Sequence, residues 1–258
     1  MFKPMLALNC PKELRFYPML VSPKLDGVRA TVQRDSEGML RLFSREGLLI
    51  PNLYTQTIHS DEAYENCDGE LVILGKDFNA VQSAVMSVHG EPNVRFKKFD
   101  MYHPEWTFTE RYLHMVQLGG DYIEATLCFD KESLMAHHRR NVADGHEGTM
   151  IRNPHATYKC GRATTTLQQL LKLKDFQDAE AIVTGWTTQK NDPAMLGALL
   201  ADFNGITIKI GTGFTQEQKR SMMTKETIGK IAKFKYQEIT VKGKPRFLGF
   251  LGFRQEGL

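Results

Sequence analysis

The feature that most restricts the fold is a series of short β-type segments, separated by polar turns, along the first three quarters of the chain. Their residues alternate between apolar and polar, or are rich in β-branched and aromatic side chains, which is typical of strands. Helical spacing is confined to three stretches, and Thr215 is a suitable N-cap for the last of them. Many strands among few helices predict an α+β fold of packed antiparallel sheets. The expected strands are residues 28–34, 40–47, 69–74, 94–102 and 148–153, and the expected helices are residues 78–90, 131–143 and 215–230.

A second domain is expected after Phe176. The chain has 258 residues, more than a single domain usually needs. A new run of strand-type residues begins after the lysine-rich LLKLKDF, and about 80 residues remain, enough for a five-stranded OB-type barrel. We therefore predict two domains, residues 1–176 and residues 177–258, the second being a small β-barrel with the OB fold.

Basic residues are concentrated in the C-terminal part. The net charge of the whole chain is only +3, which does not by itself indicate a nucleic-acid partner. Residues 178–258, however, carry 12 Lys and Arg against 8 Asp and Glu, which leaves 21 against 22 for the rest. Most of the excess lies between Lys219 and Arg246. Any surface for a polyanion is therefore expected in the second domain.

The sequence indicates neither a membrane protein nor a metal- or disulfide-dependent scaffold. No apolar run approaches the roughly 18 residues that a spanning helix needs, and the start of the chain lacks a secretion signal. We expect a cytosolic protein. The four cysteines are scattered, with no C-x-x-C pair. His137 and His138 are adjacent, so they cannot easily share one face, and we expect a solvated helix end rather than a histidine-ligated metal.

The sharpest local pattern is SPKLDGVR, residues 22–29. At the start of a strand, alternation would place Lys24 and Asp26 on one side. The pattern suits a nucleophilic lysine, although a surface turn would also explain it. A lysine with the ordinary pKa of about 10.4 is neutral in only about one molecule in a thousand at physiological pH. A nucleophilic lysine therefore needs neighbouring charges, desolvation or a metal to free its amine.

Further charged groups are present in patterns that suit one site. Glu70 heads the strand DGELVI, and Glu147 heads HEGTMIR in the same way. Lys172 and Lys174, in LLKLKDF, share one face if the segment is a strand, and two cations on one face suit the phosphates of a nucleotide. Each of these residues alone is more often a solvated surface group.

The order of these motifs resembles a known superfamily. KLDGVR, SREG, DGE, FKKFD, EG and KLK follow one another as in the covalent nucleotidyltransferases, which include DNA ligases, RNA ligases and mRNA capping enzymes. The segments NAVQSAVMSVHG, EGTMIRNPHATYKCGRATT, IGTGF and KFKYQEITVKGKPRFLGFLGFR resemble the minimal virus-encoded ATP-dependent DNA ligases of the chlorella-virus type. The resemblance spans nearly the whole chain and implies an adenylation domain followed by an OB domain.

The resemblance implies a role for each motif residue in the first domain. Lys24 would attack the α-phosphate of ATP and carry AMP. Asp26 and Arg29 belong to the same motif, with Arg29 near the nick phosphate or the AMP ribose, and Arg45 would contact AMP or the 5′-phosphate. Phe99 would stack on adenine, although an aromatic residue in FKKFD is more often part of a core. Glu70 would hold the ribose or a metal, Glu147 would contribute to a divalent-metal site, Lys172 and Lys174 would contact the α-phosphate, and Arg162 would contact the nick.

Two positions depart from the common pattern of the family. Ser22 stands where many ATP-dependent ligases have glutamate, so Ser22 and the nearby backbone would read adenine. The last family motif is reduced to FRQEGL, and Arg254 would contact the pyrophosphate side of ATP. The segment WTTQKNDPAMLGALLADF also leaves no room for the insertion that closes over DNA in the chlorella-virus type.

The resemblance implies ATP and magnesium (or manganese) as cofactors and nicked duplex DNA as the partner of a monomer. It also implies an enzyme of phage or viral origin that acts in replication or repair. Phosphate contacts in the second domain would be independent of DNA sequence and would weaken as salt rises. Three alternatives stay open: an RNA ligase, a GTP-dependent capping guanylyltransferase, and an inactive nucleic-acid-binding protein. The expected DNA contacts are Arg29, Arg45, Arg162, Lys219, Lys233, Lys235, Lys242 and Lys244.

Overall fold

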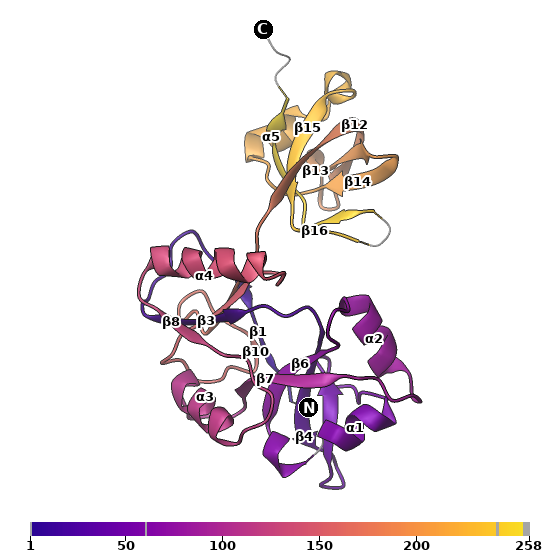
Figure 1. Cartoon of the computed structure of the whole chain (residues 1–258). Coiled ribbons are helices and arrows are strands. Elements are labelled where there is room, and N and C mark those ends of the chain that lie inside the picture. The colour runs from indigo at the N-terminus through magenta and orange to yellow at the C-terminus, as the bar shows by residue number, and fades with distance from the viewer. Residues whose placement is uncertain (1, 60, 241–242, 255–258) are drawn as a thin grey trace. The chain divides into compact units, whose positions relative to one another are not determined.

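The computed structural model describes residues 2–59, 61–240 and 243–254, and it divides into two compact units (Figure 1). The first unit is Met1–Leu173 and the second is Lys174–Leu258. The division lies three residues before the boundary expected from the sequence, at the end of the strand that contains Lys172. Each unit has its own buried apolar cluster and is described separately below.

The first unit contains a five-stranded and a four-stranded sheet, both largely antiparallel. In the five-stranded sheet the order is β2 (Leu8–Asn9), β11 (Leu170–Leu173), β9 (Thr149–Arg152), β3 (Met19–Pro23) and β8 (Thr126–Cys128), with only the β2–β11 pair parallel. In the four-stranded sheet the order is β5 (Leu40–Ser44), β4 (Val28–Arg34), β6 (Cys67–Val72) and β7 (Arg95–Met101). A short parallel pair joins β1 (Met5–Leu6) to β10 (Gly161–Arg162). The expected α+β fold of antiparallel sheets is confirmed.

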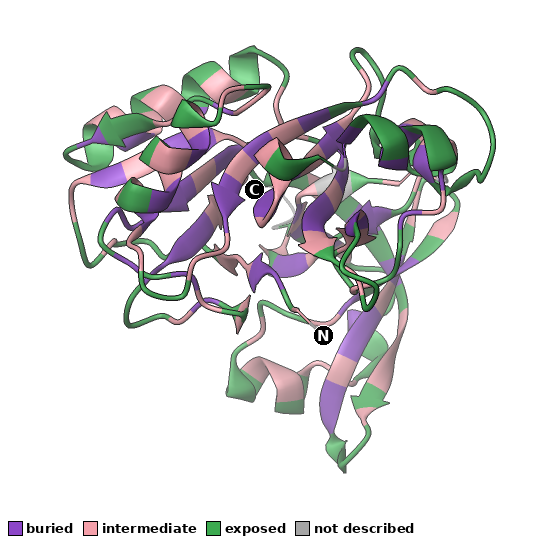
Figure 2. Ribbon diagram, turned by 90° about the horizontal axis from the view of Figure 1, so that it is seen from below, coloured by how far each residue is buried: buried purple, intermediate pink, exposed green. Residues whose placement is uncertain are grey.

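Helices pack on both large sheets of the first unit. Buried residues follow the strands, whereas the outward faces of the helices are exposed (Figure 2). Helix α4 (Lys131–Ala143) packs on β3, β8 and β9, with Leu134 in the cluster formed by Met19, Val21 and Ile151. The other helices pack on the four-stranded sheet. They are α1 (Leu53–His59), the 3-10 turn Glu62–Tyr64, α2 (Phe78–Met86) and α3 (Phe108–Gln117).

The ends of these helices follow local hydrogen bonding. Asp77 caps α2, and Thr107 with Glu110 forms a capping box on α3. The expected helix 78–90 ends instead at Met86, because the carbonyl groups of the next residues bond to the loop before α1. Asn52 Nδ2 donates to Ser87 O at 2.9 Å, and Leu53 N donates to Val88 O at 3.1 Å.

The predicted helix 131–143 is confirmed, but His138 is not solvated. His138 is 1% exposed and its Nδ1 lies 3.0 Å from Thr149 Oγ1. The expectation of a solvated helix end is therefore wrong for His138, because this face of α4 packs on β9.

The second unit is a curled sheet of five antiparallel strands. Its order is β14 (Ile206–Ile210), β13 (Asp192–Phe203), β12 (Gln177–Gln189), β15 (Ile231–Tyr236) and β18 (Gly249–Phe253), beside a small hairpin of β16 (Glu238–Ile239) and β17 (Pro245–Arg246). The described residues form no ladder that closes a barrel. The two edges of the sheet approach just beyond β14, where Phe250 N donates to Thr212 O at 2.8 Å and Thr212 Oγ1 donates to Leu248 O at 2.7 Å. The expected barrel is thus an OB-like sheet that stays open.

Helix α5 and the connection from β12 to β13 both bear on what was expected from the sequence. Thr215 caps α5 as expected, but α5 (Gln216–Ser221) is much shorter than residues 215–230. Met222 and Met223 pack against the core, and a separate 3-10 turn (Lys225–Thr227) follows, so the helix cannot continue. The connection from β12 to β13 contains only two residues between the paired Gln189 and Asp192, so no long insertion stands there.

Candidate active site

Lys24 lies in a short loop between β3 and β4, and this loop is bonded to the segment that carries Glu147. Lys24 N donates to Gly148 O at 2.9 Å, and Glu147 N donates to Lys24 O at 3.2 Å. These bonds continue the β3–β9 ladder, in which Pro23 faces Thr149. The Lys24 ammonium forms an ion pair with the Glu147 carboxylate, and the two side chains are 23% and 21% exposed. Two motifs that are distant in the sequence thus meet at one lysine.

Asp26 does not share a strand face with Lys24. The strand begins only at Val28, and residues 24–27 form a loop. The Asp26 carboxylate accepts a hydrogen bond from Phe78 N at 3.2 Å, at the first turn of α2. Gly27 accounts for this path, since a Cβ at that position would lie 2.4 Å from the Leu71 carbonyl oxygen on β6. The expected alternation of Lys24 and Asp26 is therefore wrong.

Arg29 and Glu70 face each other across the β4–β6 pair. The Arg29 guanidinium donates to both oxygens of Asp68, at 2.9 and 2.5 Å. Burial alone lowers the pKa of Arg29, but the bidentate pair with Asp68 raises it above its ordinary value. Arg29 is therefore a fixed cation, held in one orientation by a buried carboxylate.

Glu70 is a carboxyl group with a strongly shifted pKa. Burial raises its pKa to about 7, against the nearby cations Lys24 and Arg29, which lower it, while the carboxylates of Asp68 and Asp26 raise it further. A carboxyl group that titrates near neutral pH among such charges is typical of a functional site.

Two guanidinium groups lie over the ring of Phe99, on β7. The Arg29 Cζ is 5.4 Å and the Arg152 Cζ 5.2 Å from the centre of its ring. Phe99 is only half-buried and does not belong to the apolar clusters of the unit. The ring therefore borders a charged site.

A buried charge network supports these groups from behind. Asp100 is fully buried and accepts hydrogen bonds from Arg111 Nε at 2.8 Å and Arg152 Nη1 at 2.7 Å. Burial lowers the pKa of Arg152, an effect that the charges of Asp100 and Asp68 oppose. One carboxylate thus orients two arginines, of which Arg152 also covers Phe99.

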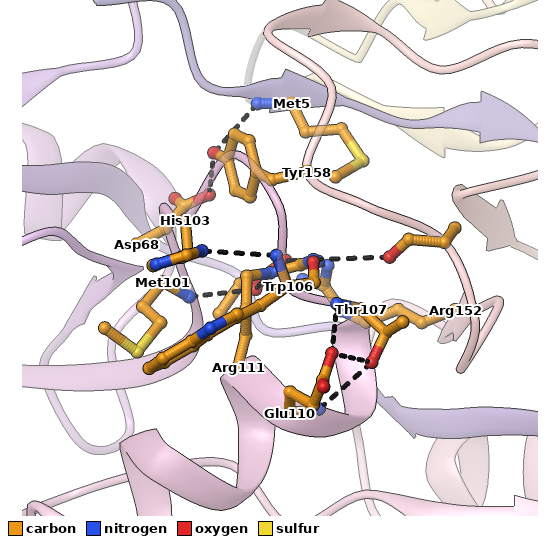
Figure 3. Close-up of polar contacts among 12 residues, drawn as sticks. Met5, Asp68, Met101, His103, Trp106, Thr107, Glu110, Arg111, Arg152 and Tyr158 are labelled. Carbon is orange, nitrogen blue, oxygen red and sulfur yellow. Dashed lines mark hydrogen bonds and ion pairs between the residues drawn. The ribbon is translucent and has the colours of Figure 1, made fainter.

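Tyr158 links Asp68, the carboxylate that pairs with Arg29, to Met5 on strand β1. Its hydroxyl donates to Asp68 at 2.7 Å and accepts from Met5 N at 3.0 Å, as Figure 3 shows. The same view labels Arg152 and Arg111, the latter a residue of helix α3. These residues were not singled out in the sequence, although Asp68 and Asp100 belong to the motifs DGE and FKKFD. The residues missed are Asp68, Asp100, Arg111, Arg152 and Tyr158.

Ser22 and Lys172 lie in one row across the five-stranded sheet. Met150 on β9 faces Ser22 on β3 and Lys172 on β11, so the three side chains share a face of the sheet. Ser22 is buried and Lys172 half-buried. The structure thus brings Lys172 to the sheet that carries Lys24 and Glu147. Lys174 lies beyond the end of β11 and belongs to the second unit, so it does not continue the strand face as expected.

Two other residues of the first unit lie on exposed segments. Arg45 is in the turn after β5 and pairs with its neighbour Glu46 at 2.8 Å. Arg162, on β10, donates to Ala7 O at 3.0 Å.

The basic residues of the second unit are partly balanced by acidic residues of β12. Lys233 faces Glu180 across the β12–β15 pair, with a separation of 3.9 Å between charged atoms, and Arg254 lies 3.2 Å from the same carboxylate. Asp178 likewise faces Lys235. Lys219 is on α5 and Lys244 precedes β17, while Lys242 lies outside the described residues. The strand pattern of residues 177–183 does not reveal that Asp178 and Glu180 face lysines of β15.

The described part of the chain contains no group of three or more His, Cys, Asp or Glu arranged to hold a metal ion. None of its helices is both long and apolar enough to cross a membrane.

Comparison with known proteins identifies the family. Residues 191–254 match the family described as DNA ligase OB-like domain. A DNA ligase of Haemophilus influenzae is 28% identical over 239 residues, 88% of this chain and 84% of that protein. The structure of a Lig E DNA ligase, studied for DNA binding with a minimal scaffold, superposes with a TM-score of 0.74 at 28% identity, over 98% of this chain and 100% of the other.

A viral relative is more similar in sequence. The Chlorella virus DNA ligase-adenylate is 31% identical over 99% of each chain, with a TM-score of 0.60. The resemblance that the motifs carry is confirmed, and the relatives favour a DNA ligase over an RNA ligase or a capping enzyme. The chain belongs to the DNA ligase family.

Proposed function

We propose that this DNA ligase uses ATP to form a lysyl-adenylate on Lys24 and then seals nicks in duplex DNA. The observation that carries the proposal is the loop of Lys24, which is bonded on both sides to the Glu147 segment and whose amine contacts the Glu147 carboxylate. These bonds fix where the Lys24 amine stands, and Glu147 is placed to accept the proton that the ammonium group must lose before it attacks.

The reaction has three steps. The neutral amine of Lys24 attacks the α-phosphorus of ATP, forming a P–N bond and losing a proton as the bond to pyrophosphate breaks. The 5′-phosphate oxygen at the nick then attacks the same phosphorus, and the P–N bond breaks as the lysine nitrogen regains a proton and leaves as the amine. Finally the 3′-hydroxyl, which loses its proton, attacks the DNA phosphate and releases AMP. The protein acts mainly by alignment and electrostatics.

The neighbouring residues form the proposed nucleotide site. The ring of Phe99, which Arg29 and Arg152 border, stacks on adenine. Ser22 and the adjacent backbone recognise the base. Glu70 holds the ribose. Lys172, in the same sheet row as Ser22, contacts the α-phosphate. Asp26 shapes the loop through its bond to Phe78 N.

The residues present suit a magnesium ion that arrives with the nucleotide. Mg²⁺ is usually held by one or two carboxylates together with substrate phosphates, rather than by a complete protein cage. Glu147 and Glu70, both close to Lys24, supply two such carboxylates. When bound, the ion would neutralise charge that develops on the phosphates.

DNA contacts are proposed in both units. Arg29, Arg45 and Arg162 would contact the strands near the nick, and the basic residues Lys219, Lys233, Lys235, Lys242 and Lys244 would hold the duplex backbone. Because Glu180 and Asp178 face Lys233 and Lys235, these two lysines should contribute less to DNA affinity than Lys219 or Lys244. For the first step we propose that Lys174 contacts the α-phosphate and Arg254 the pyrophosphate. We place the enzyme in the cytosol as a monomer.

The test is a sealing assay combined with nucleotide labelling. Incubation with Mg²⁺ and α-labelled ATP should leave label on the protein, and nicked DNA duplex should then be joined. Labelled GTP and nicked RNA duplex are the matched alternatives. Label retained only from GTP, or sealing of nicked RNA but not nicked DNA, would contradict the proposal. Chelation of the metal should stop the reaction.

Gly27 is a sensitive test of the geometry of the Lys24 loop. A Cβ there would lie 2.4 Å from Leu71 O and 2.8 Å from Val72 Cγ1, so Gly27→Ala must displace the loop. A shift of about 1 Å can cost about 100-fold in an aligned reaction, and we expect the rate of self-adenylation to fall by about that factor. Gly185→Ala is the control, because its Cβ would meet only Leu200 Cδ1, at an ordinary contact distance of 3.8 Å, and the backbone there has no positive φ. Equal rates in the two variants would show that the loop tolerates displacement.

A further inference from the structure

The C-terminal half of helix α4 is bonded to both sides of the segment that holds Glu147. On one side, the Asn141 carbonyl oxygen accepts from His146 N at 2.9 Å. On the other, the Asn141 side-chain Nδ2 donates to Thr149 Oγ1 at 2.8 Å. A single residue of α4 therefore fixes the chain directly before Glu147 and two residues after it.

Thr149 is the centre of this arrangement. It is fully buried on β9, and its hydroxyl oxygen also lies 3.0 Å from Nδ1 of the buried His138. Two side chains, one turn apart on α4, thus converge on one hydroxyl group. Buried polar groups with several partners hold a single conformation more strictly than apolar contacts do.

The bonds of Thr149 lead directly to Lys24. Thr149 faces Pro23 in the β3–β9 register, and the preceding residue, Gly148, accepts the bond from Lys24 N. Glu147 directly precedes Gly148. Its backbone N donates to Lys24 O, and its carboxylate pairs with the Lys24 ammonium group. The position of the Thr149 backbone therefore determines where both the amine and its carboxylate partner stand.

Packing alone does not require this hydroxyl. Helix α4 is already docked on the sheet through Leu134, which packs with Met19, Val21 and Ile151. Valine has nearly the shape of threonine and would suit a buried strand position better, since it buries no polar group. A polar residue in this place points to a need for a fixed backbone path.

We propose that Thr149, through His138 and Asn141, is a positioning residue for adenylation, which sets the Lys24 amine and the Glu147 carboxylate in line for attack on ATP. The proposal rests on the proposed role of Lys24 as nucleophile. His138 and Asn141 act through Thr149 and do not themselves contact the nucleotide.

The test compares Thr149→Val with Thr149→Ser and with a matched variant elsewhere. Thr55→Val is the match, because Thr55 is also fully buried and its hydroxyl donates to an asparagine, Asn52 Oδ1, at 2.7 Å, in helix α1. The single-turnover rate of self-adenylation is measured over a range of ATP concentrations, and urea unfolding is measured for each variant.

For Thr149→Val we expect the maximal adenylation rate to fall roughly 10- to 100-fold, with the half-saturating ATP concentration within about threefold of the native value. Thr149→Ser should restore the rate, because it keeps the hydroxyl, and Thr55→Val should adenylate normally at a similar cost in stability. A native rate in Thr149→Val, or an equal loss in Thr55→Val, would overturn the proposal. Label on Lys24→Ala would instead overturn the nucleophile assignment itself.

Discussion

Lys24→Ala is expected to abolish labelling of the protein by ATP and the sealing of nicked DNA, with a loss of roughly 10⁴-fold or more in each. The physical reason is that the proposed intermediate is a covalent P–N bond, and no alignment of other groups can replace its nitrogen. Lys24 is the lysine that contacts Glu147 and is joined to it through the backbone. Adenylation is measured as label from α-labelled ATP that stays on the protein in a denaturing gel. Sealing is measured as joining of the nicked strand in a denaturing gel of the DNA.

Two controls separate chemistry from folding. Lys24→Arg keeps the positive charge and most of the volume, but a guanidinium group stays protonated and is not a nucleophile, so it should be as inactive as alanine. Lys12→Ala changes an exposed lysine of the same unit and should be fully active. Lys24→Ala should still seal a nick whose 5′-phosphate already carries AMP, because the last step needs no lysine nucleophile. Persistence of ATP-dependent sealing in Lys24→Ala would refute the assignment.

The sequence predicted the strands of the first unit better than its helices. Alternation is a local signal, and residues 28–34 form β4 as expected. Helices α1 and α3 were missed: α1 is short, and its buried residues, Thr55, Gln56 and His59, are all polar, so it lacks an apolar stripe. Helix α5 was predicted too long, because the packing of Met222 against the core is a tertiary contact that no local pattern reports.

The candidate site was predicted as an ordered set of motifs, and its geometry depends on pairing between distant strands. Lys24 and Glu147 meet only because β3 lies beside β9, an order that the sequence does not specify. The supporting network could not be predicted, since Asp100 and Arg111 look like surface residues in the sequence. Their burial follows from mutual pairing, which depends on the packing of α3 against β7.

Asp100→Asn is expected to destabilise the first unit strongly, because it changes the central carboxylate of the buried network. Asp100 accepts from Arg111 and Arg152, and the three side chains are at most 5% exposed. Asparagine keeps the volume and one acceptor oxygen but removes the charge, so two guanidinium cations stay buried without their anion. Breaking a buried pair in this way typically costs about 3–5 kcal/mol, and we expect the free energy of unfolding of the first unit to fall by that amount.

The measurement must report on the first unit alone. Trp106 is suitable, because its carbonyl oxygen accepts from Arg111 Nη1 at 2.7 Å, directly beside the network. Replacing the other tryptophan, Trp186 of the second unit, with phenylalanine leaves Trp106 as the only indole fluorophore. Urea unfolding followed by its fluorescence in this background then compares the two forms of residue 100.

The matched control is Glu13→Gln, which removes the exposed pair between Glu13 and Lys131 at 2.9 Å. Its side chains are 81% and 58% exposed, so water screens the pair and the change should stay within about 1 kcal/mol. An equally small change for Asp100→Asn would show that the buried arginines find other partners.

Asp100→Asn should also weaken ATP binding at temperatures where the first unit is still folded, because Arg152 lies over the ring of Phe99. A stability loss with unchanged ATP affinity would then separate the network from the proposed adenine site.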